Sequence, residues 1–377
     1  MIATALAVGL AHGTLYSAIQ SGQPVKLYDD GVMVRVPVSA FGRTLYFLLD
    51  TGFTLSAIDS KYQPYLGKTA TPINAQTPLG TNVLQSYFHC PDISIAGKPL
   101  GLRNITSLDL KMARLISGQP CDGILGMDFL SKNIVQIDFD RQTVSLSSEV
   151  PAVVKNTYVA IPLKRFDHHY MVEASANHAG PIDLLVDTGD NSSVSLNPEE
   201  WQKVFAAAGA NGFNATVAGM GNQTAQSKIE VLDKLAVEGL AYTNLHATYI
   251  RNPADPSHLG LGFFRRHAVV FDFPDQMLYL EPGQRFSTPD KEDMSGLHLL
   301  RQGDTTIVYS VDENSPAAAQ GIKPGDVIEV VNGQSAADMT MRAIRRMLKS
   351  SDGDTVTLQL KRGEEALRIE LTLKQAI

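Results

Sequence analysis

The chain has 377 residues, 44% of them hydrophobic and 19% charged, so it can bury cores in about two to four domains, and global disorder is excluded. A net charge of −7 without a basic run argues against nucleic-acid binding. Two cysteines exclude a disulfide framework and a four-cysteine zinc site, and 30 Gly with 19 Pro indicate many turns and much β structure.

The first 30 residues are an N-terminal segment that begins with an apolar stretch from Ile2 to Leu10. The stretch is too short to span a bilayer, which needs about 20 apolar residues. It fits the apolar part of a secretory signal peptide, except that no Lys or Arg precedes it. An N-terminal helix, or a start site placed too late, are the alternatives. No other stretch is apolar enough to cross a membrane, so we expect no transmembrane helix in the mature chain.

Residues 31–150 are predicted to form a first β-rich lobe. Valines alternate with other residues from Val32 to Val38, which is the period of a strand, and Pro37 indicates an edge position. An apolar run then leads into Asp50-Thr51-Gly52. Residues 107–118 are a candidate helix, and a motif at 124–130 and a hairpin at 137–146 complete the lobe.

Residues 151–283 are predicted to form a second lobe, because they repeat these landmarks in the same order. Leu184 to Val186 lead into Asp187-Thr188-Gly189, residues 258–264 match 124–130, and residues 271–280 match 137–146. The spacing from Asp50 to Gly126 is nearly that from Asp187 to Gly260, so coincidence is a weak explanation. The second lobe also contains a predicted helix, capped by Asn197 and ending near Gly209.

Two Asp-Thr-Gly motifs allow a specific chemistry if the lobes face each other. The two carboxylates then meet, and since two adjacent like charges cannot easily both ionise, the pair holds one proton. The ionised member can take a proton from water while its partner polarises a carbonyl group, which suits hydrolysis of an amide. Gly in each motif permits the close backbone approach that this requires.

Several further features have open interpretations. Residues 77–82, with Gly80, and 217–222, with Gly219 and Gly221, are either substrate-covering flaps or ordinary surface hairpins. His168 and His169 would face opposite sides of a strand, so we expect a solvated loop edge and no metal site. Cys90 and Cys121 form either a disulfide or two buried thiols, and we favour thiols.

Residues 295–377 form a distinct C-terminal unit after a polar linker at 284–294. A short Ala-rich helix follows Ser315, a turn lies at Pro324-Gly325, and a helix is predicted around 341–348. Strands are predicted at 356–360 and 367–373, around a turn at Arg362-Gly363.

The two strand-Asp-Thr-Gly motifs, each with a later Leu-Gly motif, resemble an aspartic protease of the retropepsin/pepsin type with both lobes in one chain. The Ser-Pro-Ala-Ala, Gly-Ile, Gly-Asp-Val-Ile and Asn-Gly pattern of residues 315–333 resembles a PDZ domain. The resemblance implies a mainly β fold, a bilobed barrel pair followed by an α+β PDZ domain. It implies no metal and no cofactor.

The resemblance also assigns site residues. Asp50 and Asp187 match the catalytic pair, supported by Thr51, Gly52, Thr54, Thr188 and Gly189. In the PDZ unit, the carboxylate-binding loop corresponds to Gly296, Leu297, His298 and Leu299, and the last residue of a bound peptide is expected to contact Leu297, Ile344 or Leu348. The alternative is that this unit is a docking module bound to the protease lobes.

Three positions depart from the family pattern. Phe53 and Asp190 stand where Ala, Ser or Thr is usual, and Gly262 stands where the first lobe has Asp128. We expect Phe53 to exclude water or restrict substrate, and Asp190 to add a third acid that raises the pKa of the pair. Thr54 is expected to supply a hydroxyl group near Asp50, and Asn191 or Ser192 to do so near Asp187.

The sequence therefore predicts an aspartic endopeptidase whose PDZ module recruits a peptide or protein substrate. A catalytically inactive peptide-binding scaffold of the same fold is the alternative. The apolar start and the domain order suggest a periplasmic, secreted or envelope-associated bacterial protein, with a cytoplasmic location as the alternative.

Overall fold

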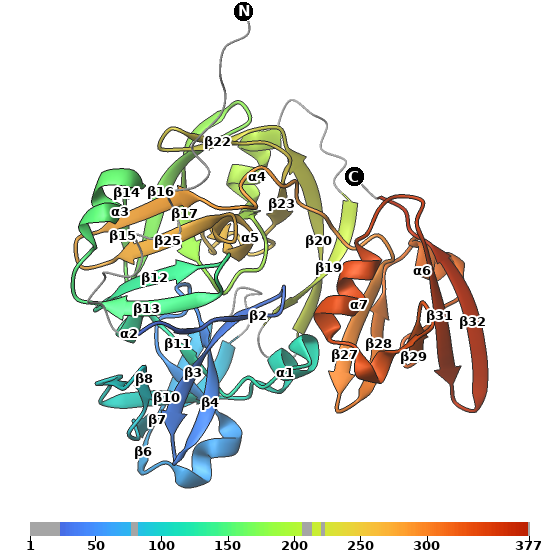
Figure 1. Ribbon diagram of the computed structural model, residues 1–377, viewed down its shortest axis with the longest axis horizontal. Coiled ribbons are helices and arrows are strands. Elements are labelled where there is room, and N and C mark those ends of the chain that lie inside the picture. The colour runs from blue at the N-terminus through green and yellow to red at the C-terminus, as the bar shows by residue number, and fades with distance from the viewer. Residues whose placement is uncertain (1–22, 77–81, 206–212, 220–222, 376–377) are drawn as a thin grey trace, which may run out of the picture.

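The computed structural model describes residues 23–76, 82–205, 213–219 and 223–375. Strands dominate these residues and form two curled lobes, a sheet between them and a separate C-terminal domain (Figure 1). The predicted fold class, mainly β with a C-terminal α+β domain, is thus confirmed. No helix within these ranges is both long and apolar enough to cross a membrane.

The first lobe is a curled sheet with the strand before Asp50 near its centre. β4 pairs with β11 in parallel, Leu49 opposite Leu125, so the chain after both strands ends at one edge. Pro37 occupies a local edge position, as predicted: β3 pairs there only with β4, and it pairs with β2 and β8 only at residues 34–35 and 39. The elements are β2 (Tyr28–Asp29), β3 (Val34–Ala40), β4 (Arg43–Leu49), β5 (Ala57–Asp59), the 3-10 helix η2 (Ser60–Tyr65), β6 (Lys68–Gln76), β7 (Asn82–His89), β8 (Ser94–Ile95), β9 (Lys98–Pro99), β10 (Asn104–Leu108), α1 (Lys111–Ser117), β11 (Gly123–Leu125) and α2 (Met127–Leu130).

The second lobe repeats this topology strand for strand. β17 and β24 pair in parallel, with Asp187 opposite Gly260, as β4 and β11 do in the first lobe. Asn197 caps α4 through the backbone N–H of Glu200, and the predicted end near Gly209 lies outside the described residues. The elements are β15 (Lys164–Phe166), β16 (His169–Ala176), β17 (Ala179–Asp187), β18 (Val194–Leu196), α4 (Pro198–Phe205), β19 (Phe213–Gly219), β20 (Gln223–Leu232), β21 (Leu235–Val237), β22 (Leu240–Tyr242), β23 (Leu245–Tyr249), β24 (His258–Gly260) and α5 (Leu261–Phe264).

A sheet shared by both lobes joins them. β12 of the first repeat pairs with β25 of the second, and one hydrophobic core runs through both lobes, including Phe129, Phe263 and Phe271. β1 belongs to this sheet and β2 to the first lobe, so the two lobes already include residues 25–29, upstream of the expected boundary at residue 31. The remaining elements are β1 (Val25–Lys26), β12 (Ile134–Asp138), β13 (Thr143–Ser147), α3 (Ala152–Thr157), β14 (Val159–Pro162), β25 (His267–Asp272) and β26 (Met277–Pro282).

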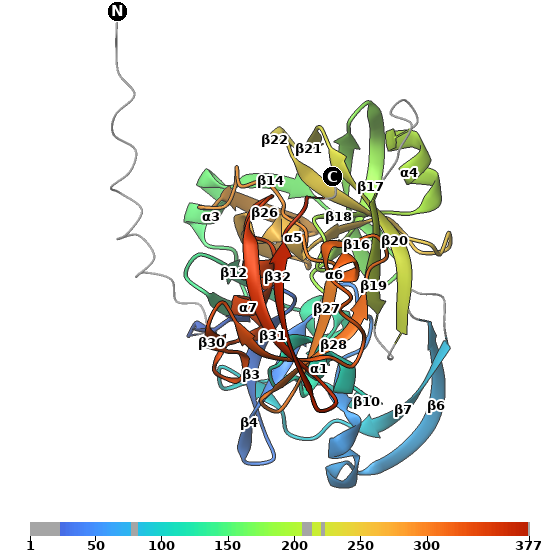
Figure 2. The same ribbon diagram turned by 90° about the vertical axis from the view of Figure 1, so that its right-hand side faces the viewer.

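The C-terminal domain has a hydrophobic core of its own. Its helix α7 and its edge strand β27 face the two lobes, and α1 of the first lobe packs against β27 (Figures 1 and 2). The predicted helix at 341–348 and the two closing strands are present. The elements are β27 (Leu297–Gln302), β28 (Thr305–Val311), α6 (Pro316–Ala319), β29 (Val327–Val331), β30 (Gln334–Ser335), the 3-10 helix η3 (Ala336–Asp338), α7 (Met341–Leu348), β31 (Thr355–Arg362) and β32 (Glu365–Thr372).

The segment at 284–294, predicted as a linker, is held against the second lobe. Asp290 forms an ion pair with Arg266 at 2.5 Å, and Glu292 one with His246 at 2.9 Å.

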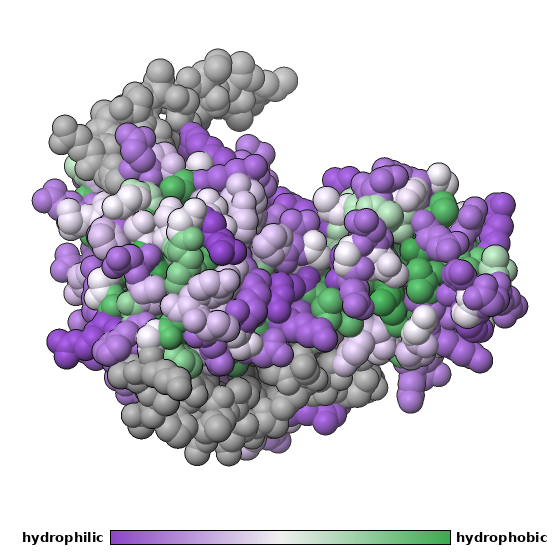
Figure 3. Space-filling model, turned by 90° about the horizontal axis from the view of Figure 1, so that it is seen from below, coloured by the Kyte–Doolittle hydropathy of each residue, from purple (hydrophilic) through white to green (hydrophobic). Residues whose placement is uncertain are grey.

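Seen from below, the surface is mostly hydrophilic, with hydrophobic patches over the C-terminal domain (Figure 3).

Candidate active site

The two Asp-Thr-Gly motifs meet at the junction of the lobes. Thr51 and Thr188 interlock there: the N–H of Thr51 donates to Thr188 Oγ1 at 3.1 Å, and the N–H of Thr188 donates to Thr51 Oγ1 at 2.9 Å. Each hydroxyl group then donates to the strand of the opposite lobe, Thr51 to Val186 O and Thr188 to Leu49 O, both at 2.8 Å. This exchange fixes the two strand ends against each other.

The two glycines of the motifs let the carboxyl groups approach the junction. A Cβ atom on Gly52 would lie 2.4 Å from the carboxyl carbon of Asp187, and one on Gly189 would lie 2.5 Å from that of Asp50. Each carboxyl group therefore packs directly against the glycine of the other motif, where a larger residue would clash. Within each motif, the glycine N–H donates to Oδ1 of its own aspartate, at 3.0 Å in the first lobe and 2.8 Å in the second.

Both aspartates of the pair are buried, with 8% of each residue exposed. Burial, and next the charge of Asp187, raise the pKa of Asp50 well above its ordinary value. Burial also raises the pKa of Asp187, although the charge of His258 opposes this increase. Two carboxyl groups in such surroundings share a proton readily.

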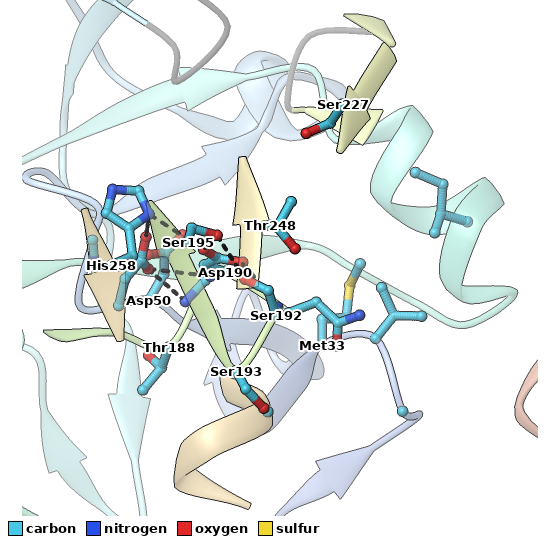
Figure 4. A pocket seen from close by; sticks show the side chains of 18 of the residues that line it. Met33, Asp50, Thr188, Asp190, Ser192, Ser193, Ser195, Ser227, Thr248 and His258 are labelled. Carbon is cyan, nitrogen blue, oxygen red and sulfur yellow. Dashed lines mark hydrogen bonds and ion pairs between the residues drawn. The ribbon is translucent and has the colours of Figure 1, made fainter. Parts of the chain in front are cut away.

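The surroundings of the two aspartates differ on the two sides of the junction. Phe53 packs half-buried against an apolar cluster that includes Leu48 and Leu110. On the other side, Asp190 accepts hydrogen bonds from the hydroxyl groups of Ser192 at 2.5 Å and Ser195 at 2.6 Å. Figure 4 shows Asp190, Ser195 and His258 clustered beside Asp50.

His258 is a site residue that the sequence did not reveal. It lies buried on β24, and its Nδ1 is 3.3 Å from Asp190 Oδ2 and 3.4 Å from Asp187 Oδ2. Burial by itself would raise the pKa of Asp190, but the hydrogen bonds and the charge of His258 lower it to about 2. As expected, the charge of Asp190 helps to raise the pKa of Asp187, but the charge of His258, which lies beside both carboxyl groups, opposes this increase. The sequence contained one signal for this residue: in the alignment of the two repeats, His258 stands at the position where the first repeat has the apolar Ile124.

His169 also takes part in the junction. Its Nε2 lies 3.3 Å from Thr54 Oγ1, across the lobes, and burial lowers the pKa of the imidazole. The predicted solvated loop edge holds for His168, which is exposed, and is wrong for His169. The Thr54 hydroxyl, expected beside Asp50, is thus engaged with His169. On the Asp187 side, Ser192 bonds to Asp190, and Asn191 accepts from Arg265 at 2.9 Å.

A cavity of about 1120 Å³ extends from the pair of aspartates Asp50 and Asp187, here called the dyad, to the C-terminal domain. Its lining includes Asp50, Phe53 and Asp187 from the lobes, and Leu297 and Arg345 from the C-terminal domain. The hairpins β6–β7 and β19–β20 carry the candidate flaps. Gly219 is the last residue of β19, whereas Gly80 and Gly221 lie outside the described residues.

The predicted peptide-binding groove of the C-terminal domain faces the first lobe. Leu297, Leu299, Ile344 and Leu348 are all buried, and the Nη2 atom of Arg345 on α7 donates to Ile116 O at 2.5 Å.

The N–H groups of the loop at 296–299, which was predicted to bind a carboxylate, already have partners within the chain. The N–H of Gly296 donates to Asp293 Oδ1 at 2.8 Å, that of Leu297 to Ser295 Oγ at 3.1 Å, and His298 pairs with Asp312 at 2.9 Å. A peptide terminus must therefore displace internal contacts in order to bind there.

Cys90 and Cys121 are free thiols, as we favoured, but only Cys121 is fully buried and Cys90 is half-buried. Within the ranges that the structure describes, no group of three or more His, Cys, Asp or Glu side chains is arranged to hold a metal ion.

Comparison with known families agrees with this geometry. The model of the retroviral aspartyl protease family matches residues 26–151, and that of the PDZ domain matches residues 307–362. The chain therefore combines an aspartyl protease-like domain with a C-terminal PDZ domain, which confirms the resemblance drawn from the sequence.

Among curated proteins, the chain is similar to a probable CtpA-like serine protease of Staphylococcus saprophyticus, with 32% identity over 21% of this chain and 16% of that protein. A probable CtpA-like serine protease of Staphylococcus aureus (strain N315) is 23% identical over 49% of this chain and 39% of its own length. Rho GTPase-activating protein 21-A of Xenopus laevis is 24% identical over 39% of this chain and 8% of its own length. The matches thus span well under half the length of these relatives.

Proposed function

We propose that the protein is an aspartic endopeptidase in which Asp50 and Asp187 activate one water molecule between them. The observation that carries this proposal is the mutual packing of each carboxyl group against the glycine of the other motif. The ionised aspartate takes a proton from the water, whose oxygen attacks the peptide carbonyl carbon. The protonated aspartate gives its proton to the carbonyl oxygen, so the pair keeps one proton throughout this step.

We also propose that the PDZ domain recruits the substrate. The cavity that begins at the dyad reaches Leu297 and Arg345, so one extended peptide can occupy both regions. β27 is the end strand of its sheet, and α1 packs against it, so the addition of a peptide strand to β27 requires α1 to move. A terminal carboxylate would also compete with Asp293 for the loop N–H groups. Substrate capture is therefore coupled to the contact between α1 and β27.

A mixed peptide library incubated with the full chain from acidic to neutral pH tests the proposal. Asp50→Asn and Asp187→Asn each preserve the shape of the side chain but cannot exchange the proton, so each should lower turnover by about 10²–10⁴-fold or more. Asp183→Asn is the matched control, because Asp183 lies on the same strand as Asp187 but is exposed and paired with Lys164. Undiminished cleavage by Asp187→Asn would refute the dyad.

The peptide-binding scaffold without catalysis remains the second candidate, because Asp190 and His258 depart from the usual surroundings of the dyad. It predicts that the unaltered chain binds library peptides and returns them uncleaved at every pH. A serine-type mechanism, suggested by the names of the staphylococcal relatives, predicts instead that the Asp50→Asn variant keeps its activity.

We further propose an exported, envelope-associated or secreted location, from the apolar segment Ile2 to Leu10. Fractionation of cells that make the full chain tests this. An unprocessed product found only in the cytosol would contradict it.

A further inference from the structure

We propose that His258 is a positioning residue that makes Asp187 the ionised member of the dyad and leaves the shared proton on Asp50. The inference rests on the proposed function of the dyad and goes beyond it, since it assigns the base role to Asp187 and the acid role to Asp50.

The geometry around His258 breaks the symmetry of the two lobes. In the parallel pairing of β17 with β24, His258 lies opposite Leu185, two residues before Asp187, and its Nδ1 is 3.4 Å from Asp187 Oδ2. The equivalent residue beside Asp50 is Ile124, which is buried and apolar. A cation thus stands directly beside one carboxyl group, while an aliphatic side chain occupies the matching place beside the other.

The groups that face His258 favour its charged form. Burial would lower the pKa of the imidazole, but the hydrogen bond to Asp190 and the charges of Asp187, Asp190 and Asp255 raise it to about 9. Burial raises the pKa of Asp255 to about 6, so its charge is lost below that pH. His258 therefore stays positive as the pH rises until about 9, and Asp190, with its pKa of about 2, stays negative across the same window.

The remaining titratable groups near the dyad agree with this assignment. Burial lowers the pKa of His169, so at neutral pH this residue adds little positive charge beside the motif of the first lobe. The charge of His258 opposes the raised pKa of both carboxyl groups, but His258 contacts Asp187 directly, whereas the charge of Asp187 adds to burial in raising the pKa of Asp50. At weakly acidic to neutral pH, Asp187 is then the carboxylate that takes the proton from water, and Asp50 is the acid that protonates the carbonyl oxygen.

The first test needs no substrate. In the full chain with isotope-labelled histidine, the NMR signal of His258, assigned by its loss in His258→Ile, should titrate near pH 9. In Asp190→Asn the signal should titrate at lower pH, because the anion that holds the proton is gone. Titration in the unaltered chain near the ordinary value of 6.5 would overturn the proposal.

The second test is the pH profile of peptide cleavage. His258→Ile gives the second lobe the residue that the first lobe has, and it leaves Asp190 as an uncompensated anion beside Asp187. The pKa of Asp187 should then rise, so the acid limb of the profile, where activity is lost as Asp187 becomes protonated, should move to higher pH by about 1–3 pH units. The double variant His258→Ile/Asp190→Asn removes both charges and should return the acid limb toward its position in the unaltered chain. A profile for His258→Ile that superimposes on that of the unaltered chain would also overturn the proposal.

His178→Gln is the control, because His178 is an exposed histidine of the second lobe that does not line the cavity, and this variant should leave the profile unchanged. The fluorescence of the chain's one tryptophan, Trp201 in the second lobe, reports whether each variant is folded. If no protein cleaves any peptide, the proposed function fails, while the NMR titration still decides the charge of His258.

Discussion

The interlocked threonines give the sharpest stability prediction. Thr188→Val removes one hydroxyl group that makes two buried hydrogen bonds, to Leu49 O and from the N–H of Thr51. Both of these groups belong to the other lobe and lose their partner inside the protein. An unsatisfied buried polar group costs about 1–3 kcal/mol, so the free energy of unfolding should fall by about 2–6 kcal/mol.

Urea denaturation followed by Trp201 fluorescence measures this loss, because that single tryptophan is buried in the second lobe. Thr188→Ser keeps the hydroxyl group and deletes one methyl group, so it should cost only about 1 kcal/mol. The mirror variant Thr51→Val breaks the other two hydrogen bonds and should cost about as much as Thr188→Val. Equal unfolding midpoints for Thr188→Val and Thr188→Ser would show that the hydroxyl exchange does not hold the lobes together.

Three further predictions follow from the raised pKa values and the occupied loop. Because the pKa of Asp50 is raised, Asp50 keeps its proton above the ordinary carboxyl pKa of 3.8, and activity should be lost only as the pH rises through the raised pKa of Asp50. A profile of kcat/KM against pH that falls near 3.8 would contradict this. Asp293→Ala frees two loop N–H groups, so affinity for a peptide with a free C-terminus should rise in a fluorescence anisotropy titration, while an amidated peptide gains nothing; equal gains would exclude carboxylate recognition. Burial raises the pKa of Cys90 and Cys121 to about 12, and Cys121 is the fully buried thiol. In a Cys90→Ser variant, an aromatic disulfide reagent at about pH 8 should therefore label Cys121 only after urea unfolds the chain, and rapid labelling of this variant in its native state would contradict the burial of Cys121.

The dyad was predictable because it depends on local patterns that occur twice. An apolar run before each Asp-Thr-Gly identifies a buried strand, and the repeat implies that two such strands meet. The same holds for the PDZ domain, whose turn residues and helix period are local signals. What sequence patterns predict well is therefore the identity and order of elements.

The contacts that cross between elements were not predictable. His258 matches the apolar Ile124 in the repeat, and its partners become evident only from the register of β17 with β24. His169 contacts Thr54 across two lobes, and α1 packs against β27 across two domains. Each depends on how separate units dock, which is set by packing over long sequence distances.

The two lobes also hold the same motif with different polar networks. In the first lobe, Asp128 Oδ1 accepts from the N–H of Ser56 at 2.9 Å and from its hydroxyl group at 2.6 Å, which braces the loop after Asp50. The second lobe has Gly262 at the matching place, and a Cβ atom there would lie 2.8 Å from Ser193 Oγ. The loop after Asp187 therefore lies directly against Gly262, and there is no room for a carboxylate equivalent to that of Asp128.

In the second lobe, Asp190 stabilises the loop after Asp187 instead, because it accepts hydrogen bonds from the hydroxyl groups of Ser192 and Ser195. A buried carboxylate in this position requires a compensating cation, because its desolvation is costly without one. His258 meets that requirement, and the position that satisfies Asp190 also places the imidazole against Asp187. The second lobe thus has Asp190 and His258 beside its aspartate of the dyad, where the first lobe has Asp128 and Ile124, and this difference gives Asp50 and Asp187 unlike electrostatic surroundings.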